Sequence, residues 1–146
     1  MSELLARIET KDEVKNYLTS LKYMLDNGAT ITFQSTRKVD RNRDVKYTNK
    51  YTVGELFPKE IPEVALKREL KTLTVENYMR TVKDINRPNK SEMREFGKVY
   101  SGYGDVYIKI RVELFSKETN GNHQTFVMSF HFAERPFSDS DFPYKN

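Results

Sequence analysis

The sequence predicts an α+β fold in which two or three N-terminal helices pack on a mainly antiparallel sheet. In the first half of the chain, apolar residues recur at the spacing of amphipathic helices. Later, residues 106–114 and 126–132 alternate apolar and polar side chains, as strands with one buried face do. The 146 residues are about one domain long, and no linker divides them, so we expect a single domain over residues 1–146.

The first helix is expected from about Lys11 to Asn27. Thr10 and Glu13 have the spacing of a capping box, and Gly28 supplies a left-handed stop. Its apolar stripe consists of Val14, Leu18, Leu21 and Leu25.

The following segments alternate between short strands, helices and loops. Residues 29–35 predict a short strand, and residues 51–56 a short helical turn before a proline. Residues 62–73 predict a helix with proline at its first position, followed by a shorter helix from 74 to about 81. The polar run 83–93 lacks apolar periodicity and is expected to be an exposed loop.

The second half predicts three strands in meander order. The last two are joined across Asn120-Gly121, a hairpin turn signal within a longer loop. Antiparallel pairing would place two apolar rows on the core side: Val106, Ile108, Ile110, Val112 and Leu114 with Phe126, Met128, Phe130 and Phe132. The other side would then gather Tyr107, Lys109, Arg111 and His131. The tail, residues 135–146, is expected to lay Phe137 and Phe142 on the body.

Composition narrows the chemistry. The chain has no cysteine, which excludes disulfides and thiolate sites, and with only His123 and His131 we expect no metal site and no cofactor. No apolar run is long enough to span a membrane, so we expect a soluble, cytoplasmic protein. The net charge of +4 permits a nucleic-acid partner without requiring one.

Positive charge is concentrated in a basic loop, residues 37–50. The loop is either an electrostatic arm for a phosphate backbone or an acidic protein, or a solvated loop kept soluble by its charge. Its cations are Arg37, Lys38, Arg41, Arg43, Lys46 and Lys50.

Four sequence blocks, LTVENYMR, MREFGK, GDVYIKI and MSFHFAERP, occur here in an order that resembles the MqsR-type toxins. These are small ribonucleases of the RelE-like superfamily that act in toxin and antitoxin pairs. The resemblance is firmest from Leu70 to Pro136. It implies a RelE/MqsR-like domain that cleaves single-stranded messenger RNA without metal and is neutralised by an antitoxin. The positions that match the family's motifs are Arg80, Lys98, Tyr107, Lys109 and His131. Arg94 and Glu95 depart from the family pattern, which tends to have a large aromatic residue there.

Metal-free RNA cleavage needs a base, an acid and cations that stabilise charge at phosphorus. His131 could be the base or the acid, Lys98, Lys109 and Arg111 would clamp the phosphate, and Tyr107 could stack on a base or donate a hydrogen bond. Further RNA contacts are expected from Arg94 and from Arg37, Lys38, Arg41, Arg43 and Lys46 of the basic loop.

Each assignment has a structural alternative. His131 could be a hydrogen-bonded structural residue, Tyr107 could serve sheet packing, and Arg80 could terminate a helix. Lys109 and Arg111 could belong to a solvated strand face. Three function classes therefore stay open: a toxin-like endoribonuclease, a catalytically silent relative from a phage or mobile element that inhibits a host nucleic-acid-handling protein, and an RNA-binding module without cleavage.

Overall fold

The computed structural model describes residues 4–35, 44–113 and 124–145. Its helices are α1 (Lys11–Asp26), α2 (Asn49–Leu56) and α3 (Pro62–Leu70). Its strands are β1 (Leu4–Arg7), β2 (Thr30–Phe33), β3 (Tyr78–Asp84), β4 (Met93–Tyr100), β5 (Gly104–Glu113) and β6 (Gln124–Phe132). Short 3-10 turns lie at Val45–Tyr47, Val75–Asn77 and Asp139–Asp141.

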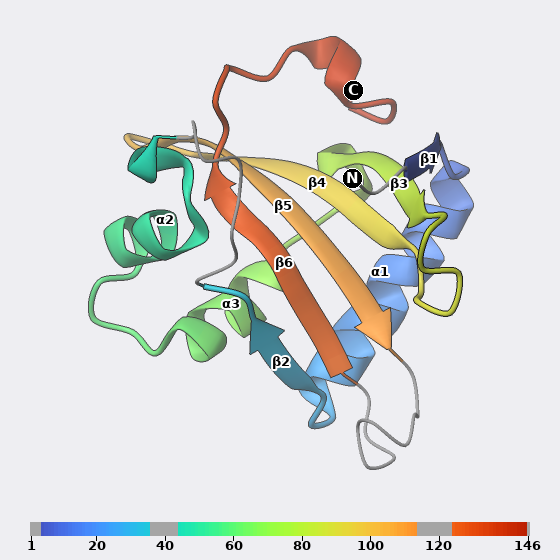
Figure 1. Cartoon of the computed structure of the whole chain (residues 1–146), viewed down its shortest axis with the longest axis horizontal. Helices are drawn as coiled ribbons and strands as arrows, with labels where there is room; N and C mark the ends of the chain where they lie inside the picture. Colours follow the sequence, from blue (N-terminus) through green and yellow to red (C-terminus); the bar gives the residue numbers. More distant parts are fainter. Residues whose placement is uncertain (1–3, 36–43, 114–123, 146) are drawn as a thin grey trace.

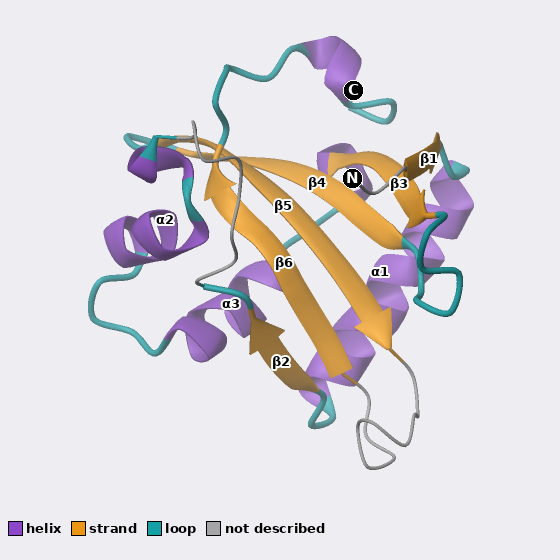
Figure 2. Cartoon of the chain, in the orientation of Figure 1, coloured by secondary structure: helices purple, strands orange, loops and turns teal. Residues whose placement is uncertain are grey.

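The six strands form one sheet in the order β1-β3-β4-β5-β6-β2. Every neighbouring pair is antiparallel except β2 and β6, which are parallel. Helix α1 crosses behind this twisted sheet, α2 lies beside β6, and the C-terminal segment passes over one end of the long strands (Figure 1). Figure 2 shows the helices packed around a single sheet. Because this sheet is mainly antiparallel, the expected α+β class is confirmed.

Helix α1 begins and ends where its sequence signals place it. The Glu13 backbone N–H donates to Thr10 Oγ1 at 3.1 Å, and the Thr10 N–H donates to Glu13 Oε1 at 2.9 Å. Gly28 adopts φ +88°, a conformation that favours glycine and ends the helix. The four predicted stripe residues Val14, Leu18, Leu21 and Leu25 are all buried.

The core fills the space between these helices and one face of the sheet. Leu66, Leu70 and Leu73, in and just after α3, join the α1 stripe in a single apolar cluster. The strands contribute Phe96, Val106, Ile108, Ile110, Val112, Val127, Phe130 and Phe132. We call this the helix-covered face of the sheet.

The segment after α3 differs from the prediction. The expected helix from 74 to 81 is a single turn, Val75–Asn77, and Tyr78 already belongs to β3. Tyr78 is fully buried, and its hydroxyl accepts the Glu9 backbone N–H at 3.0 Å. Strand pairing with β4 on one side and with the unpredicted β1 on the other outweighs the weak helical pattern.

The pairing of β5 and β6 also corrects the expected rows. Lys109 pairs with Ser129 but Ile110 pairs with Val127, so Met128 is an extra residue in β6. Because of this bulge, Val127 replaces Met128 on the helix-covered face. Phe126 lies opposite Arg111, on the other face. The prediction that Phe126 and Met128 join the core row was wrong.

Side chains of helix α2 form hydrogen bonds with the backbone of β6 at the bulge and along its outer edge. The Asn49 side-chain amide donates to Met128 O at 3.0 Å, and its oxygen accepts the Phe130 N–H at 3.0 Å. Thr52 Oγ1 accepts the Phe132 N–H at 2.8 Å. These polar side chains replace ladder partners where the pairing with β2 ends, which protects a sheet edge. Within the described segments, no helix has both the length and the apolar character needed to cross a bilayer.

Candidate functional site

The face of the sheet opposite the helix-covered face is polar around β4, β5 and β6. In the register, Gly97, Tyr107 and His131 form one row across these strands, and Glu95, Lys109 and Ser129 form the next. Directly opposed residues share a face, so the side chains of each row point the same way. We define the polar face by Arg80, Glu95, Tyr107, Lys109, Arg111, Ser129 and His131.

His131 and Tyr107 are packed side by side on this face. Their ring centroids are 5.4 Å apart. His131 is 7% exposed, and its Nδ1 lies 2.9 Å from the backbone oxygen of Phe132. A carbonyl oxygen only accepts hydrogen bonds, so Nδ1 carries the proton of this contact. When the imidazole is neutral, Nε2 is then the ring nitrogen without a hydrogen.

On the same face, three charged side chains from the neighbouring strands β3, β4 and β5 meet. Arg80 Nε donates to Glu95 Oε1 at 2.7 Å, and Lys109 Nζ lies 3.9 Å from Glu95 Oε2. Glu95 is 3% exposed, whereas the side chain of Arg80 is 47% exposed. The hydrogen bond to Glu95 raises the pKa of Arg80. Arg80 lies in strand β3, so the alternative that it terminates a helix is wrong.

Arg111 is on the same face of β5, two residues after Lys109. Its guanidinium carbon lies 4.6 Å from the centre of the Phe126 ring, within the range of a cation–π contact. Arg111 therefore lies beyond Lys109 along the strand, on the side away from Tyr107 and His131.

The C-terminal segment, residues 133–145, completes a depression beside His131. The depression has a volume of about 820 Å³, within the range of small-molecule sites. Tyr107 and His131 line it from the sheet, and Arg135, Phe137 and Ser138 line it from the C-terminal segment. His131 is buried, but it borders a space that a ligand can enter.

Two contacts fix this segment over the polar face. The Phe137 N–H donates to Asp105 Oδ2 at 2.8 Å, and the rings of Phe137 and Phe142 lie over Gly97. The expectation that these two phenylalanines pack on the body is confirmed. Further along, the Tyr144 hydroxyl donates to the backbone oxygen of Glu9.

Replacing Gly97 by alanine should displace this segment. A Cβ at position 97 would lie 2.8 Å from both Phe137 Cε2 and Phe142 Cζ, which is too close for carbon atoms. We expect a loss of about 1–3 kcal/mol in the free energy of unfolding, measured by chemical denaturation, and faster proteolysis within residues 133–145.

The matched control is Gly54→Ala. A Cβ at Gly54, within α2, would meet no atom within 4 Å. This variant should be neutral or stabilised by up to about 1 kcal/mol, because alanine favours helix. Equal stability and equal proteolysis of the Gly97 variant and the unaltered protein would contradict the packing argument.

Lys98 is separated from the other expected catalytic residues. It pairs with Val106 and points to the helix-covered side, where Nζ lies 3.3 Å from Glu69 Oε1 and also contacts Thr72 Oγ1. Lys98 therefore links β4 to the end of α3. Because Lys109 and Arg111 lie on the opposite face of the sheet, Lys98 cannot bind a phosphate together with them. The sequence contained the signal, because Lys98 stands two residues from Phe96 and shares its face.

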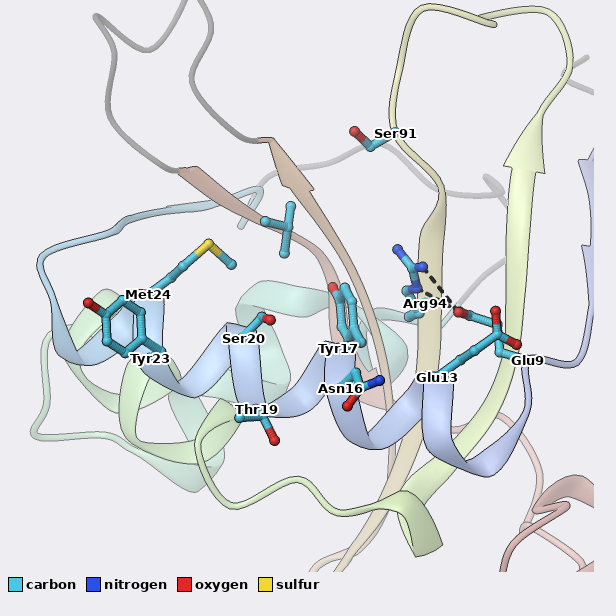
Figure 3. Close-up of a pocket in the computed structure, with 11 residues that line it drawn as sticks. Glu9, Glu13, Asn16, Tyr17, Thr19, Ser20, Tyr23, Met24, Ser91 and Arg94 are labelled. Atoms are coloured by element: carbon cyan, nitrogen blue, oxygen red, sulfur yellow. Dashed lines mark hydrogen bonds and ion pairs between the residues drawn. The ribbon is translucent and has the colours of Figure 1, made fainter.

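Arg94 also lies on the helix-covered side. Its Nε donates to Glu9 Oε1 at 2.8 Å, and its guanidinium carbon lies 4.3 Å from the centre of the Tyr17 ring of α1. Figure 3 shows Arg94 directed at Glu9, at one end of a groove of about 990 Å³ along α1. The Arg94 side chain is 18% exposed. This placement separates Arg94 from the polar face and makes it part of a buried ion pair.

The basic loop falls largely outside the described residues, including Arg37, Lys38, Arg41 and Arg43, as does the Asn120-Gly121 turn. Lys46 is described and exposed, with Nζ 5.7 Å from the centre of the Tyr47 ring. In the described part of the chain, no three histidine or acidic side chains form a group suited to a metal ion.

Glu95 is the site residue that sequence reasoning did not assign. It is recognisable only through the register, because Arg80 and Lys109 lie 15 residues before it and 14 residues after it. No family model, curated protein or solved structure matches the chain, so the geometry of the site and the sequence blocks are the basis for its function.

Proposed function

We propose that the chain is an MqsR-type endoribonuclease that cleaves single-stranded RNA at the polar face. The observation that carries the proposal is the gathering of His131, Tyr107, Lys109 and Arg80 on one face, beside a depression. An imidazole, a phenol and two cations supply the groups that RNA cleavage without a metal needs.

In the proposed reaction, the 2′-oxygen of a ribose attacks the adjacent phosphorus and the bond to the 5′-oxygen breaks. His131 makes one of the two proton transfers through Nε2, either taking the proton of the 2′-hydroxyl or protonating the departing 5′-oxygen, and a solvent water makes the other. Lys109 and Arg80 stabilise the negative charge that develops on the phosphate oxygens. Tyr107 stacks on a base or donates a hydrogen bond, as aromatic side chains do in single-stranded RNA recognition.

The four sequence blocks support this assignment and suggest the partner. Arg80, Tyr107, Lys109 and His131 are four of the five positions that match the toxin family's motifs, and these four share the polar face. An antitoxin protein that blocks this face would then neutralise the activity. Single-stranded RNA fits better than a duplex, because an unpaired base can enter the depression beside Tyr107.

The decisive experiment is cleavage of a labelled single-stranded RNA in the presence of a metal chelator. The unaltered protein should cut the RNA and leave a 2′,3′-cyclic phosphate, but it should not cut the same sequence made of DNA. Lys109→Ala should lower the rate about a hundredfold, because a cation is lost from the charge-stabilising set. Lys59→Ala, a change at an exposed lysine between α2 and α3, is the matched control and should retain the rate.

The alternatives give different results. RNA that is bound with strong salt dependence but never cut would indicate an RNA-binding module. A protein that neither binds nor cuts RNA, yet inhibits a nucleic-acid-handling enzyme, would indicate the silent relative. Either result would overturn the endoribonuclease proposal.

A further inference from the structure

A buried carboxylate lies between the two cations of the polar face. Glu95 is in β4, and its neighbours Arg80 and Lys109 come from the strands on either side, β3 and β5. It accepts from Arg80 Nε at 2.7 Å and from Arg80 Nη2 at 3.5 Å, and Lys109 Nζ lies 3.9 Å from its Oε2. A buried charge is costly unless it is paired, so these cations stabilise the carboxylate of Glu95 inside the sheet.

The charges and the exposed fractions of these three side chains suggest an anionic ligand. Among the contacts described for this cluster, two positive charges, Arg80 and Lys109, meet one negative charge, Glu95. The carboxylate is 3% exposed and the Lys109 side chain is 13% exposed, while the Arg80 side chain is 47% exposed, so Arg80 is the member of the cluster that meets solvent most. A guanidinium held on one edge by a carboxylate presents its other N–H groups in a fixed geometry, which suits the oxygens of a phosphate.

We propose that Glu95 is a positioning residue that holds Arg80 and Lys109 as a two-cation clamp for one phosphate group of the substrate. The proposal rests on the proposed function, because it takes the phosphate of RNA as the ligand. Arg80 contacts the phosphate with the guanidinium edge directed away from Glu95, and Lys109 contacts it beside Tyr107. Glu95 itself does not touch the substrate.

The position of the clamp relative to His131 fits this role. Glu95 and Lys109 are in the row next to Gly97, Tyr107 and His131, so Lys109 is two residues from Tyr107 on the same strand and face. Lys109 Nζ lies 6.0 Å from the centre of the Tyr107 ring, and Tyr107 in turn contacts His131. The clamp and His131 therefore both border Tyr107, so a phosphate held beside Lys109 would lie next to the Tyr107 ring.

The test compares Glu95→Gln with the unaltered protein on single-stranded RNA. Glutamine has the same shape but no charge, so it leaves two uncompensated cations that no longer have a fixed orientation. We expect kcat to fall about tenfold to a hundredfold, because misplaced groups lose transition-state contacts. RNA binding should become tighter, and the slope of log affinity against log salt should steepen by about 0.7. A purely structural role for Glu95 predicts lower thermal stability without this opposite change of kcat and affinity.

Two further variants control for charge and folding. Glu92 accepts hydrogen bonds from Arg7 Nε at 2.9 Å and from Arg7 Nη2 at 2.7 Å. Glu92→Gln removes one negative charge from this pair and should change neither kcat nor the salt slope. Glu95→Asp keeps the charge but shortens the side chain, so it should lower kcat and leave the salt slope unchanged. If the glutamine variant does not fold, the kcat of the aspartate variant tests whether Glu95 positions the two cations.

A binding measurement separates this proposal from the endoribonuclease proposal. The Nε–H resonance of Arg80 in ¹⁵N-labelled protein should shift when a tetranucleotide of DNA, which lacks the 2′-hydroxyl, is added. If the resonance shifts but RNA is not cut, the clamp stands and the endoribonuclease proposal falls. If the resonance does not shift, or if Glu95→Gln leaves kcat and the salt slope unchanged, the clamp is overturned, whether or not RNA is cut.

Discussion

Replacement of His131 by alanine is expected to slow RNA cleavage by about a hundredfold to ten-thousandfold. The ordinary pKa of an imidazole lies closer to neutral pH than that of a phenol, a lysine or an arginine, so we assign proton transfer to His131. Its orientation is fixed by the Nδ1 contact to Phe132 O at 2.9 Å and by the Tyr107 ring. Alanine removes the proton-transfer group but keeps the phosphate clamp, so RNA binding should change little.

The rate is measured with saturating RNA, and binding is measured separately with the DNA form of the same sequence. Thr125→Ala is the matched control, because Thr125 is also a buried polar residue of β6 but pairs with Val112 on the helix-covered face. A folded His131→Ala protein that cuts RNA at the unaltered rate would exclude proton transfer by this residue. The histidine would then be a structural residue that packs against Tyr107.

Replacement of Glu9 by alanine is expected to lower the free energy of unfolding by about 3 kcal/mol. Glu9 is buried, and it accepts hydrogen bonds from Arg94 Nε at 2.8 Å, from Arg94 Nη2 at 3.3 Å and from Thr81 Oγ1. Alanine would leave the Arg94 guanidinium on the helix-covered side with Glu92, at 3.9 Å, as its remaining acidic neighbour within 4 Å among the described residues. An unpaired, poorly solvated charge accounts for most of the expected loss.

The contribution of Glu9 should also depend on pH. Burial by itself raises the pKa of Glu9, but hydrogen bonds from Arg94 and Thr81 and the charges of Arg94 and Arg7 outweigh it, so the pKa lies below its ordinary value of 4.5. A carboxyl with a depressed pKa in the folded state stabilises the fold above its unfolded pKa, and this stabilisation is lost as the pH falls through the folded value. The stability difference between the unaltered protein and Glu9→Gln should therefore be full at neutral pH and shrink below about 4.5.

Denaturant unfolding between pH 3 and pH 7 measures both effects. Glu60→Ala is the control, because Glu60 also pairs with an arginine, Arg68, but on the surface. Surface pairs contribute little to stability, so this variant should unfold close to the unaltered protein. A Glu9→Ala protein as stable as the Glu60 variant would mean that Arg94 finds solvent or another partner after the substitution.

Local signals in the sequence predicted much of the fold. The capping box of Thr10, the stripe of α1 and the proline at the start of α3 each act within one or two turns, and each prediction is confirmed. The alternation in β5 also placed Tyr107, Lys109 and Arg111 on one face, because a strand sends successive side chains to opposite sides. Such patterns are set by the geometry of a single element, so they can be read without knowledge of its neighbours.

The predictions failed where a residue's environment comes from a distant element. β1 has no alternation of its own and becomes a strand only by pairing with β3, about 75 residues later. At the bulge, the Met128 carbonyl accepts a hydrogen bond from Asn49 of α2, and the shifted register places Phe126 beside Arg111 instead of in the expected core. Arg80 was expected near the end of a short helix, but the pairing of β3 and β4 places it in a strand beside Glu95.

The amino-acid pattern was thus sufficient to establish the class of fold and the chemical character of the polar face. Which side chains act together was settled by the packing of the strands. Lys98 and Lys109 are both lysines of central strands, yet they project from opposite sides of the sheet, and only Lys109 shares a face with His131. The reason is physical: periodicity describes one element at a time, whereas the meeting of Arg80, Glu95 and Lys109 depends on the register of three strands, fixed by side chains far apart in the chain.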